Sequence, residues 1–259
     1  MDINTTLLLA IFFSFLLAFV FSMFGQGGGS VYSPLLILLG YAVLISTSTS
    51  LVLNLITSVS AGYVFYRNKM IDLKASFMFV PGIVMGAFAG GVWSKSVNTN
   101  LLLWLFVFFL IVVGARMVYI YWEKVNVEEK RPANLSVSTY VLIVIFSLAV
   151  GVISGLLGVG GGILIVPFMT NVLKYPTKSA AGSSHLIISF SALAGILGHA
   201  ASHRLDYPLI AVTGIAVLIG GNLGAQFSLR VKPRMIKAGL GLLMWALSAQ
   251  ILVKLLGVM

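Results

Sequence analysis

Residues 25–34 read GQGGGSVYSP, and residues 158–167 read GVGGGILIVP. Both stretches fit the pattern Gly-x-Gly-Gly-Gly-x-x-x-x-Pro, and both lie between strongly apolar runs. Irregular backbone inside a membrane is tolerated only where protein or a water-filled cavity satisfies its polar groups. The repeated motif therefore indicates two broken membrane helices with equivalent roles.

The composition places the chain in a bilayer. Of its 259 residues, 59% are hydrophobic and only 8% are charged, whereas about a quarter of a soluble domain is charged. Long apolar runs come close to the ~20 residues that cross a bilayer as a helix, and they cover 7–24, 75–93, 101–122, 140–157, 209–227 and 235–256. No alternating strand pattern interrupts them, so we predict an all-α, multi-pass integral membrane protein.

The net charge of +10 is also consistent with a membrane protein. The basic residues gather in short loops between the apolar runs, as orientation signals do, so we expect no nucleic-acid partner. The chain has no cysteine, which excludes disulfides and thiol chemistry. The N-terminal MDINTT lacks the basic segment of a signal peptide, so the first run is interpreted as a retained span.

The chain divides into two similar halves. We expect a first membrane repeat at 1–122, a cytoplasmic linker at 123–136 and a second membrane repeat at 137–259. Beyond the glycine motif, Ser50 aligns with Ser183, and Asp72 aligns with Asp206 after one inserted residue. Matching positions over this length indicate an internal repeat.

The halves are predicted to be inverted. Each has a shorter apolar run after its glycines, at 31–45 and 163–173, and five crossings per half reverse the second half. This topology leaves only Lys95, Arg204 and Lys254 of the 16 basic residues outside, a strong positive-inside bias. We therefore predict ten crossings with both termini outside. If the short runs are re-entrant instead, each half has four spans and the halves are parallel.

The glycine breaks are candidates for an anion site. Glycine lets backbone amides approach a ligand closely, and amides at a helix N-terminus attract anions. No acidic residue lies within a predicted span and no basic residue lies in mid-span, which favours a site made of neutral donors. The substrate-binding candidates are Gly25, Gln26, Gly27, Gly28, Gly29, Ser30, Ser48, Ser50, Asn54, Gly158, Gly160, Gly161, Gly162, Ser183, Ser184 and His185. We expect no metal site, no cofactor and no catalytic residue.

Several polar residues have structural interpretations beside the functional one. Gln26 and Asn54 either line the site or join helices by hydrogen bonds. His185 is either a proton relay or a structural histidine. Asn222 and Gln226, one turn apart, either face the same cavity or serve packing. We expect interfacial positions for His199 and His203, and close helix packing at Gly82, Gly86, Gly90, Gly220 and Gly224.

The paired motifs, the later Ser/Thr clusters and the two matching halves resemble the TauE/SafE family, also called TSUP permeases. GVGGGILIVP with KSAAGSSH at 178–185 carries most of the resemblance, while the first half departs from it at Gln26 and at STSTS 46–50. The resemblance implies a carrier that moves sulfite, sulfonates or related sulfur-containing anions across the cytoplasmic (inner) membrane.

We therefore expect a secondary transporter for a small anion, with export as the expected direction. The chain has no P-loop, so an ion gradient, for example of protons, is the expected energy source. Small-residue faces permit a homodimer. The alternatives are an anion channel and a carrier of a different small organic anion. An intramembrane enzyme using Ser154 and His199 is disfavoured, because Val152 breaks the Gly-x-Ser-Gly pattern of such proteases.

Overall fold

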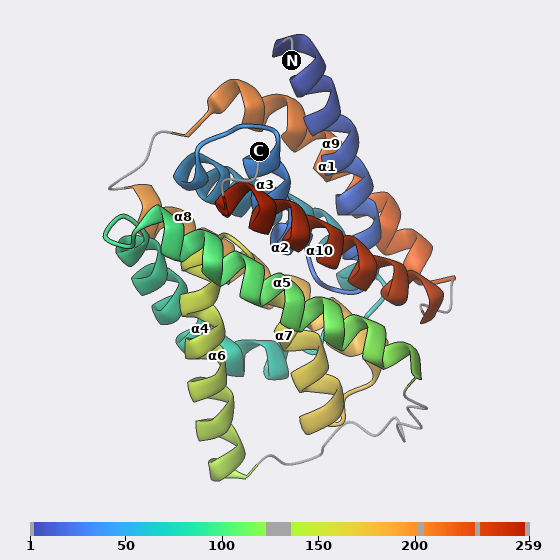
Figure 1. The fold of residues 1–259 in the computed structure, drawn as a ribbon. Coiled ribbons are helices and arrows are strands. Elements are labelled where there is room, and N and C mark those ends of the chain that lie inside the picture. The colour runs from blue at the N-terminus through green and yellow to red at the C-terminus, as the bar shows by residue number, and fades with distance from the viewer. Residues whose placement is uncertain (1–2, 123–135, 201–204, 231–233, 257–259) are drawn as a thin grey trace.

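The computed structural model describes residues 3–122, 136–200, 205–230 and 234–256 as a bundle of helices, with no strand in these ranges (Figure 1). The elements in chain order are α1 (Ile3–Ser22), α2 (Gly29–Leu38), α3 (Val43–Arg67), α4 (Leu73–Ser94), α5 (Thr99–Trp122), α6 (Val137–Leu157), α7 (Gly162–Pro167), the π-helix η1 (Phe168–Val172), α8 (Thr177–Ala200), α9 (Tyr207–Ser228) and α10 (Arg234–Leu255). Nearly all of the predicted linker lies outside the described residues.

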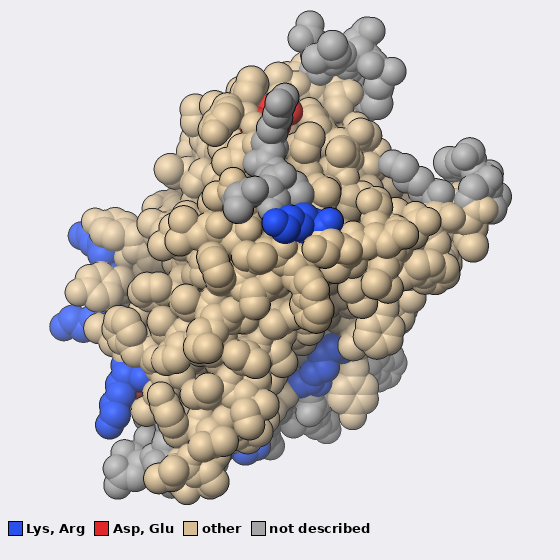
Figure 2. Space-filling model, turned by 90° about the vertical axis from the view of Figure 1, so that its left-hand side faces the viewer, with Lys and Arg blue, Asp and Glu red and all other residues tan. Residues whose placement is uncertain are grey.

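The described helices suit a bilayer. Six of them, α3, α4, α5, α6, α8 and α9, have described segments that are long and apolar enough to cross a membrane. Large apolar side chains such as Phe108 and Met85 point outward from the bundle, and Figure 2 shows a surface made mostly of uncharged residues. Such a surface is stable in contact with lipid. The prediction of an all-α integral membrane protein is confirmed, while the number of crossings stays a prediction.

One predicted helix is wrong in its bounds. The apolar run 31–45 does not form a continuous helix, because α2 ends at Leu38 and α3 begins at Val43. The chain turns at Gly40, whose φ of 98° is left-handed and cannot continue a right-handed helix. α2 thus has 10 residues and is about 15 Å long, half the ~30 Å core. The second short run agrees better with the structure, since α7 and η1 together cover 162–172.

Helices of one half pack against helices of the other in a reciprocal way. α4 lies along α6, and α1 lies along α9, so the first helix of each half contacts the fourth helix of the other (Figure 1). Glycines make both contacts: a Cβ on Gly220 would lie 2.6 Å from the Phe15 carbonyl oxygen, and one on Gly86 would lie 2.9 Å from the Val152 nitrogen. The predicted packing role of these glycines is confirmed, and the small-residue faces are occupied within the chain.

Equivalent helices pair with each other and run in opposite directions. Along α3 and α8, Gly62 adjoins His185 and Gly195 adjoins Leu51. Along α5 and α10, the indole of Trp245 donates to the Ile111 carbonyl and the hydroxyl of Ser248 donates to the Val107 carbonyl. In each pair, residue numbers rise along one helix as they fall along the other, so the paired helices are antiparallel.

The two halves have the same type of helix cap at equivalent positions. Asp72 accepts a hydrogen bond from the Ala75 nitrogen at the start of α4, and Asp206 accepts one from the Leu209 nitrogen at the start of α9, each over 3.0 Å. These carboxylates satisfy amides that a helix start leaves unpaired. The aspartates that align in the sequence therefore perform the same local task.

Candidate functional site

The two glycine motifs form loops with the same backbone conformation. In the first loop Gly25, Gly27 and Gly28 have positive φ, and in the second Gly158, Gly160 and Gly161 do. L-residues with a side chain rarely adopt this conformation. Gln26 and Val159 occupy the matching position that does not need it, which explains why a non-glycine residue is accepted there in both halves.

The loops pass each other in the protein interior. A Cβ on Gly29 would lie 2.7 Å from the carbonyl oxygen of Val159, and a Cβ on Gly162 would lie 2.8 Å from that of Gly25. The first residue of each short helix therefore touches the loop of the other half, in antiparallel order. We call the place where these loops meet, residues 25–29 and 158–162, the loop crossing. All of these residues are buried.

Asn54, near the middle of α3, lies between the two loops. Its Oδ1 accepts a hydrogen bond from the Gly29 nitrogen over 3.3 Å. Its Nδ2 lies next to Gly160, where an added Cβ would collide with it. The carboxamide thus holds the N-terminus of α2 with its acceptor and presents two N–H donors to the second loop.

Serine hydroxyls attach the loops across the two halves. Ser50 on α3 donates to the Gly158 carbonyl over 2.8 Å and to the Gly29 carbonyl over 3.1 Å. In the other direction, Ser184 on α8 donates to the carbonyl of Gly25. A helix of each half therefore holds the first glycine of the other half's motif.

The loop crossing is rich in polar atoms without a partner. Among the described residues, four such buried atoms lie in the first loop, at the start of α2 or on the face of α3 that touches the loop: Gln26 Oε1, Ser30 Oγ, Asn54 Nδ2 and Ser58 Oγ. Nearly all buried polar groups in proteins are hydrogen-bonded, so we expect partners for these atoms from outside the described part of the chain, as water or a ligand. Three of the four belong to predicted site residues.

Ser58 is the residue that sequence reasoning missed. Its hydroxyl would lie 2.7 Å from a Cβ on Gly27. Two signals in the sequence point to it: it follows Asn54 by one helical turn, and it aligns with Ser191 in the second half. Ser191 itself bonds Ser154 over 2.9 Å, so the two halves use this position differently.

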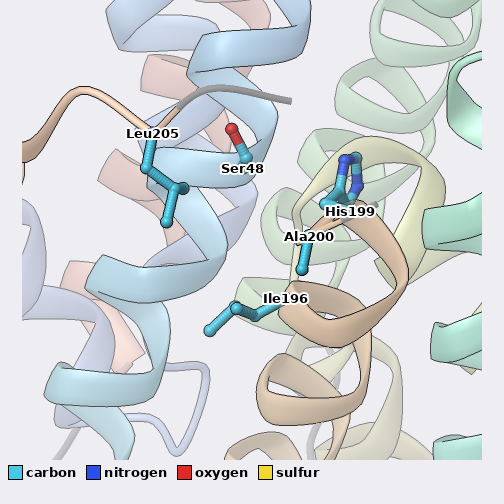
Figure 3. A pocket seen from close by; sticks show the side chains of 5 residues that line it. All are labelled: Ser48, Ile196, His199, Ala200 and Leu205. Atoms are coloured by element: carbon cyan, nitrogen blue, oxygen red, sulfur yellow. The ribbon is translucent and has the colours of Figure 1, made fainter. Parts of the chain in front are cut away.

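Two predicted serines have their hydroxyls turned elsewhere. Ser48 donates within its own helix to the Leu44 carbonyl over 2.9 Å. It also lines a pocket between α3 and α8 (Figure 3), which is formed by Ser48, Ile196, His199, Ala200 and Leu205. The hydroxyl of Ser183 accepts from the Asp72 nitrogen over 2.9 Å and thus fixes the start of α4. The structure brings neither hydroxyl to the loop crossing.

His185 lies beside the loop crossing and is fully buried. Its Nε2 lies 3.0 Å from the carbonyl oxygen of Ser22, three residues before Gly25. Its ring stacks on Phe65 with 5.5 Å between centroids. The ring therefore holds the end of α1 where the chain enters the first loop.

His199, which we expected at the membrane interface, is enclosed between helices in the last turn of α8. It is buried, with Nε2 2.8 Å from the Gly155 carbonyl and Nδ1 3.3 Å from the Ser94 hydroxyl. Gly91 and Gly198 let α4 and α8 approach closely at this end, which encloses the imidazole. His203 lies outside the described residues.

The structure also shows the contacts of the Asn222–Gln226 pair and of Ser154, the serine of the enzyme alternative. Gln226 is exposed and donates to the Asn222 side chain, so this pair bonds internally on α9. Ser154 bonds Ser191 and not His199, so the Ser154–His199 dyad of the enzyme alternative does not form. No group of three or more His, Cys, Asp or Glu residues with metal-binding potential occurs in the described part of the chain.

Comparison with known proteins identifies the family of this chain. The sequence model of the family described as sulfite exporter TauE/SafE matches residues 10–251. The probable membrane transporter protein YunE of Bacillus subtilis is 28% identical, over 83% of this chain and 86% of its own length. YdhB of the same organism, also named a probable membrane transporter protein, is 27% identical over 85% and 90%.

A probable membrane transporter protein of Methanocaldococcus jannaschii is 25% identical, over 87% of this chain and 88% of its own. No solved structure matches the chain. The family match spans both halves and both glycine loops. The chain belongs to the sulfite exporter TauE/SafE family and is a membrane transporter, not an enzyme.

Proposed function

We propose that this transporter moves small sulfur-containing anions, such as sulfite or organosulfonates, out of the cell across the cytoplasmic membrane. The observation that carries the proposal is the loop crossing, where buried donors lack partners. The amide of Asn54 and the hydroxyls of Ser30 and Ser58 offer N–H and O–H groups there. A sulfite or sulfonate group carries three oxygen acceptors, which such neutral donors bind without a formal counter-charge.

The neutral character of the site favours transport over tight binding. A buried Lys or Arg would hold an anion strongly, and the described residues at the loop crossing include neither. Hydrogen bonds from neutral donors are each worth about 1 kcal/mol net. Several of them select an oxyanion and still release it, as a carrier requires.

Alternating access between inverted repeats is part of the proposal. The reciprocal packing of α1 with α9 and of α4 with α6, together with the antiparallel pairing of α3 with α8, supports an inverted arrangement. Carriers of this type place their sites at broken helices between the repeats. We infer that both termini lie outside and that the substrate is exposed to one side at a time.

Flux into proteoliposomes tests the proposal. Purified protein is reconstituted, and uptake of radiolabelled sulfite and ethanesulfonate is measured against acetate and chloride. Saturable uptake of the sulfur anions, with competition between them, is the expected result. Preference for acetate would favour a carrier of a different organic anion, and unitary currents in a planar bilayer would favour a channel.

A further inference from the structure

The Nδ1 atom of His185 is a buried proton acceptor without a partner. A carbonyl oxygen can only accept, so the contact between Nε2 and the Ser22 oxygen, 3.0 Å long, requires Nε2 to carry the hydrogen. In the neutral ring, Nδ1 then holds a free lone pair. No hydrogen-bond partner for Nδ1 occurs among the described residues.

His185 and its neighbour Ser184 connect α8 at two points to the segment that contains the first loop. Its own Nε2 holds the carbonyl of Ser22 at the end of α1. The preceding residue, Ser184, holds the carbonyl of Gly25, the first glycine of the loop. A change in the charge of His185 therefore acts directly on the segment that leads into the anion site.

Within the described residues, the protein offers His185 no counter-charge. The helices packed around α8 are α3, α4, α6 and α7 with η1, and the ring also touches α1. Some titratable groups on these helices are exposed and therefore cannot neutralise a charge on the buried ring. They are Tyr63, Tyr66, Arg67, Lys74, Tyr140 and Lys178. The carboxylate of Asp72 accepts from the Ala75 nitrogen, and Tyr175 lies beyond η1 in the apolar cluster around Phe79. The other α8 histidine, His199, lies near the far end of the helix.

An anion at the loop crossing supplies the missing charge. Opposite charges attract strongly in a medium of low dielectric constant, so the bound anion favours the imidazolium form and the imidazolium favours the bound anion. Such mutual stabilisation is reciprocal by thermodynamic linkage. The doubly loaded state is neutral overall for a monoanion, whereas each singly loaded state has a charge buried in the membrane.

We propose that His185 Nδ1 binds the proton that is carried together with the anion, one proton per monoanion. This inference rests on the proposed function. The proton adds to the lone pair of Nδ1 from the side where the anion enters, and it leaves from the same atom when the anion is released. No other bond changes. Export then follows the outward anion gradient and is driven further by an interior that is more acidic than the exterior.

The test is anion accumulation driven by a pH difference. Ethanesulfonate is the probe, because its acid form is negligible at the pH used and does not leak through lipid. With the interior one pH unit more alkaline, coupled entry of one proton and one anion accumulates the anion about tenfold, since one pH unit equals about 1.36 kcal/mol. A lumenal pH dye reports the proton in the same experiment.

His185→Gln is the informative variant, because its side-chain amide still donates to the Ser22 carbonyl but does not titrate. Its accumulation ratio should fall from about tenfold to about one. His199→Gln is the matched control, since that imidazole is also buried on α8 and has a partner at each ring nitrogen; it should keep the wild-type ratio.

The two hypotheses fail in different ways. If wild-type protein moves no ethanesulfonate or sulfite at any pH, the proposed function fails and the inference fails with it. If wild-type protein moves ethanesulfonate without accumulation and without lumenal acidification, only the inference is overturned. It is equally overturned if His185→Gln accumulates the anion tenfold. If the variant is inactive, the wild-type dye signal decides alone.

Discussion

Asn54 on α3 accepts a hydrogen bond through Oδ1 from the backbone nitrogen of Gly29, the first residue of α2, over 3.3 Å. Because the acceptor faces this amide, the two donors of Nδ2 face the second loop at Gly160, and Nδ2 has no partner in the described chain. One side chain thus contacts both halves at the loop crossing. It is the residue on which the proposed anion site depends most.

Replacing Asn54 by Leu should abolish most of the transport. The substitution keeps the number and branching of the side-chain heavy atoms but removes two donors worth about 1 kcal/mol each, so sulfonate uptake should fall at least about tenfold. It also leaves the Gly29 amide unpaired, which costs about 1–3 kcal/mol of stability. Initial uptake rates in proteoliposomes measure the first effect, and thermal unfolding in detergent measures the second.

Asn222→Leu is the matched control for this variant. Asn222 is also an asparagine within an apolar helix, but its partner is the exposed Gln226 one turn away on α9. Its replacement should leave uptake within about twofold of wild type. Equal losses in the two variants would show that Asn54 acts through general helix packing and not through the site.

Gly160→Ala should unfold the site for two separable reasons. Gly160 has a φ of 77°, and a Cβ there would run into the Nδ2 of Asn54. Gly40→Ala isolates the first reason, because Gly40 has a φ of 98° and an added Cβ meets nothing within 4 Å. The left-handed conformation alone costs about 1–2 kcal/mol for an L-residue.

We therefore expect Gly40→Ala to lower the unfolding temperature slightly and to keep transport. Gly160→Ala should lower the temperature further and lose transport. Circular dichroism melts in detergent and uptake assays on the same preparations provide the comparison. Intact transport by Gly160→Ala would mean that the loop crossing tolerates a side chain and is not closely packed around its ligand.

Gly86→Ala tests the packing of α4 against α6. An added Cβ would collide with the Leu148 carbonyl and lie 3.0 Å from the Cα of Gly151, so two backbones must separate. Overpacking of this kind costs about 1–3 kcal/mol. Gly62→Ala is the control, because a Cβ there would lie at an ordinary 3.6 Å from the Cβ of His185. Alanine at position 62 should be neutral or stabilising, since glycine weakens a helix by about 0.5–1 kcal/mol.

The sequence motif predicted a break in a membrane helix at each glycine loop but not what the loops touch. Three glycines of each motif recur at the same spacing because the backbone needs a left-handed conformation at each. This spacing can be seen in the sequence alone. The donation from Ser50 to the Gly158 carbonyl joins opposite halves. Nothing in the local pattern around a serine says which distant carbonyl it will face.

Burial was the other quantity that sequence could not predict. In a soluble helix, apolar periodicity marks the inward face, but a membrane helix is apolar on both its lipid face and its packed face. His199 near the end of α8 is therefore indistinguishable by pattern from an interfacial histidine. It is buried because Gly91 and Gly198 bring α4 and α8 together, a contact between residues far apart in the chain.

Cysteine accessibility tests the inverted arrangement directly. The wild-type chain has no cysteine, so a single introduced thiol is the only target for a membrane-impermeant maleimide. Asn68 is exposed at the end of α3, in the loop that leads to α4, and Tyr207 is exposed at the start of the equivalent helix α9. Lys95 and Arg230 are exposed just after the ends of α4 and α9. These four sites therefore form two matched pairs, one member in each half.

If the halves are inverted, the members of a pair lie on opposite sides of the membrane. Lys95→Cys and Tyr207→Cys should be labelled in intact cells, and Asn68→Cys and Arg230→Cys only after permeabilisation, because the basic loops stay inside. Parallel halves would label both members of a pair from the same side. That result would also remove alternating access by inversion, since a site between parallel repeats has no symmetry that exchanges its inner and outer faces.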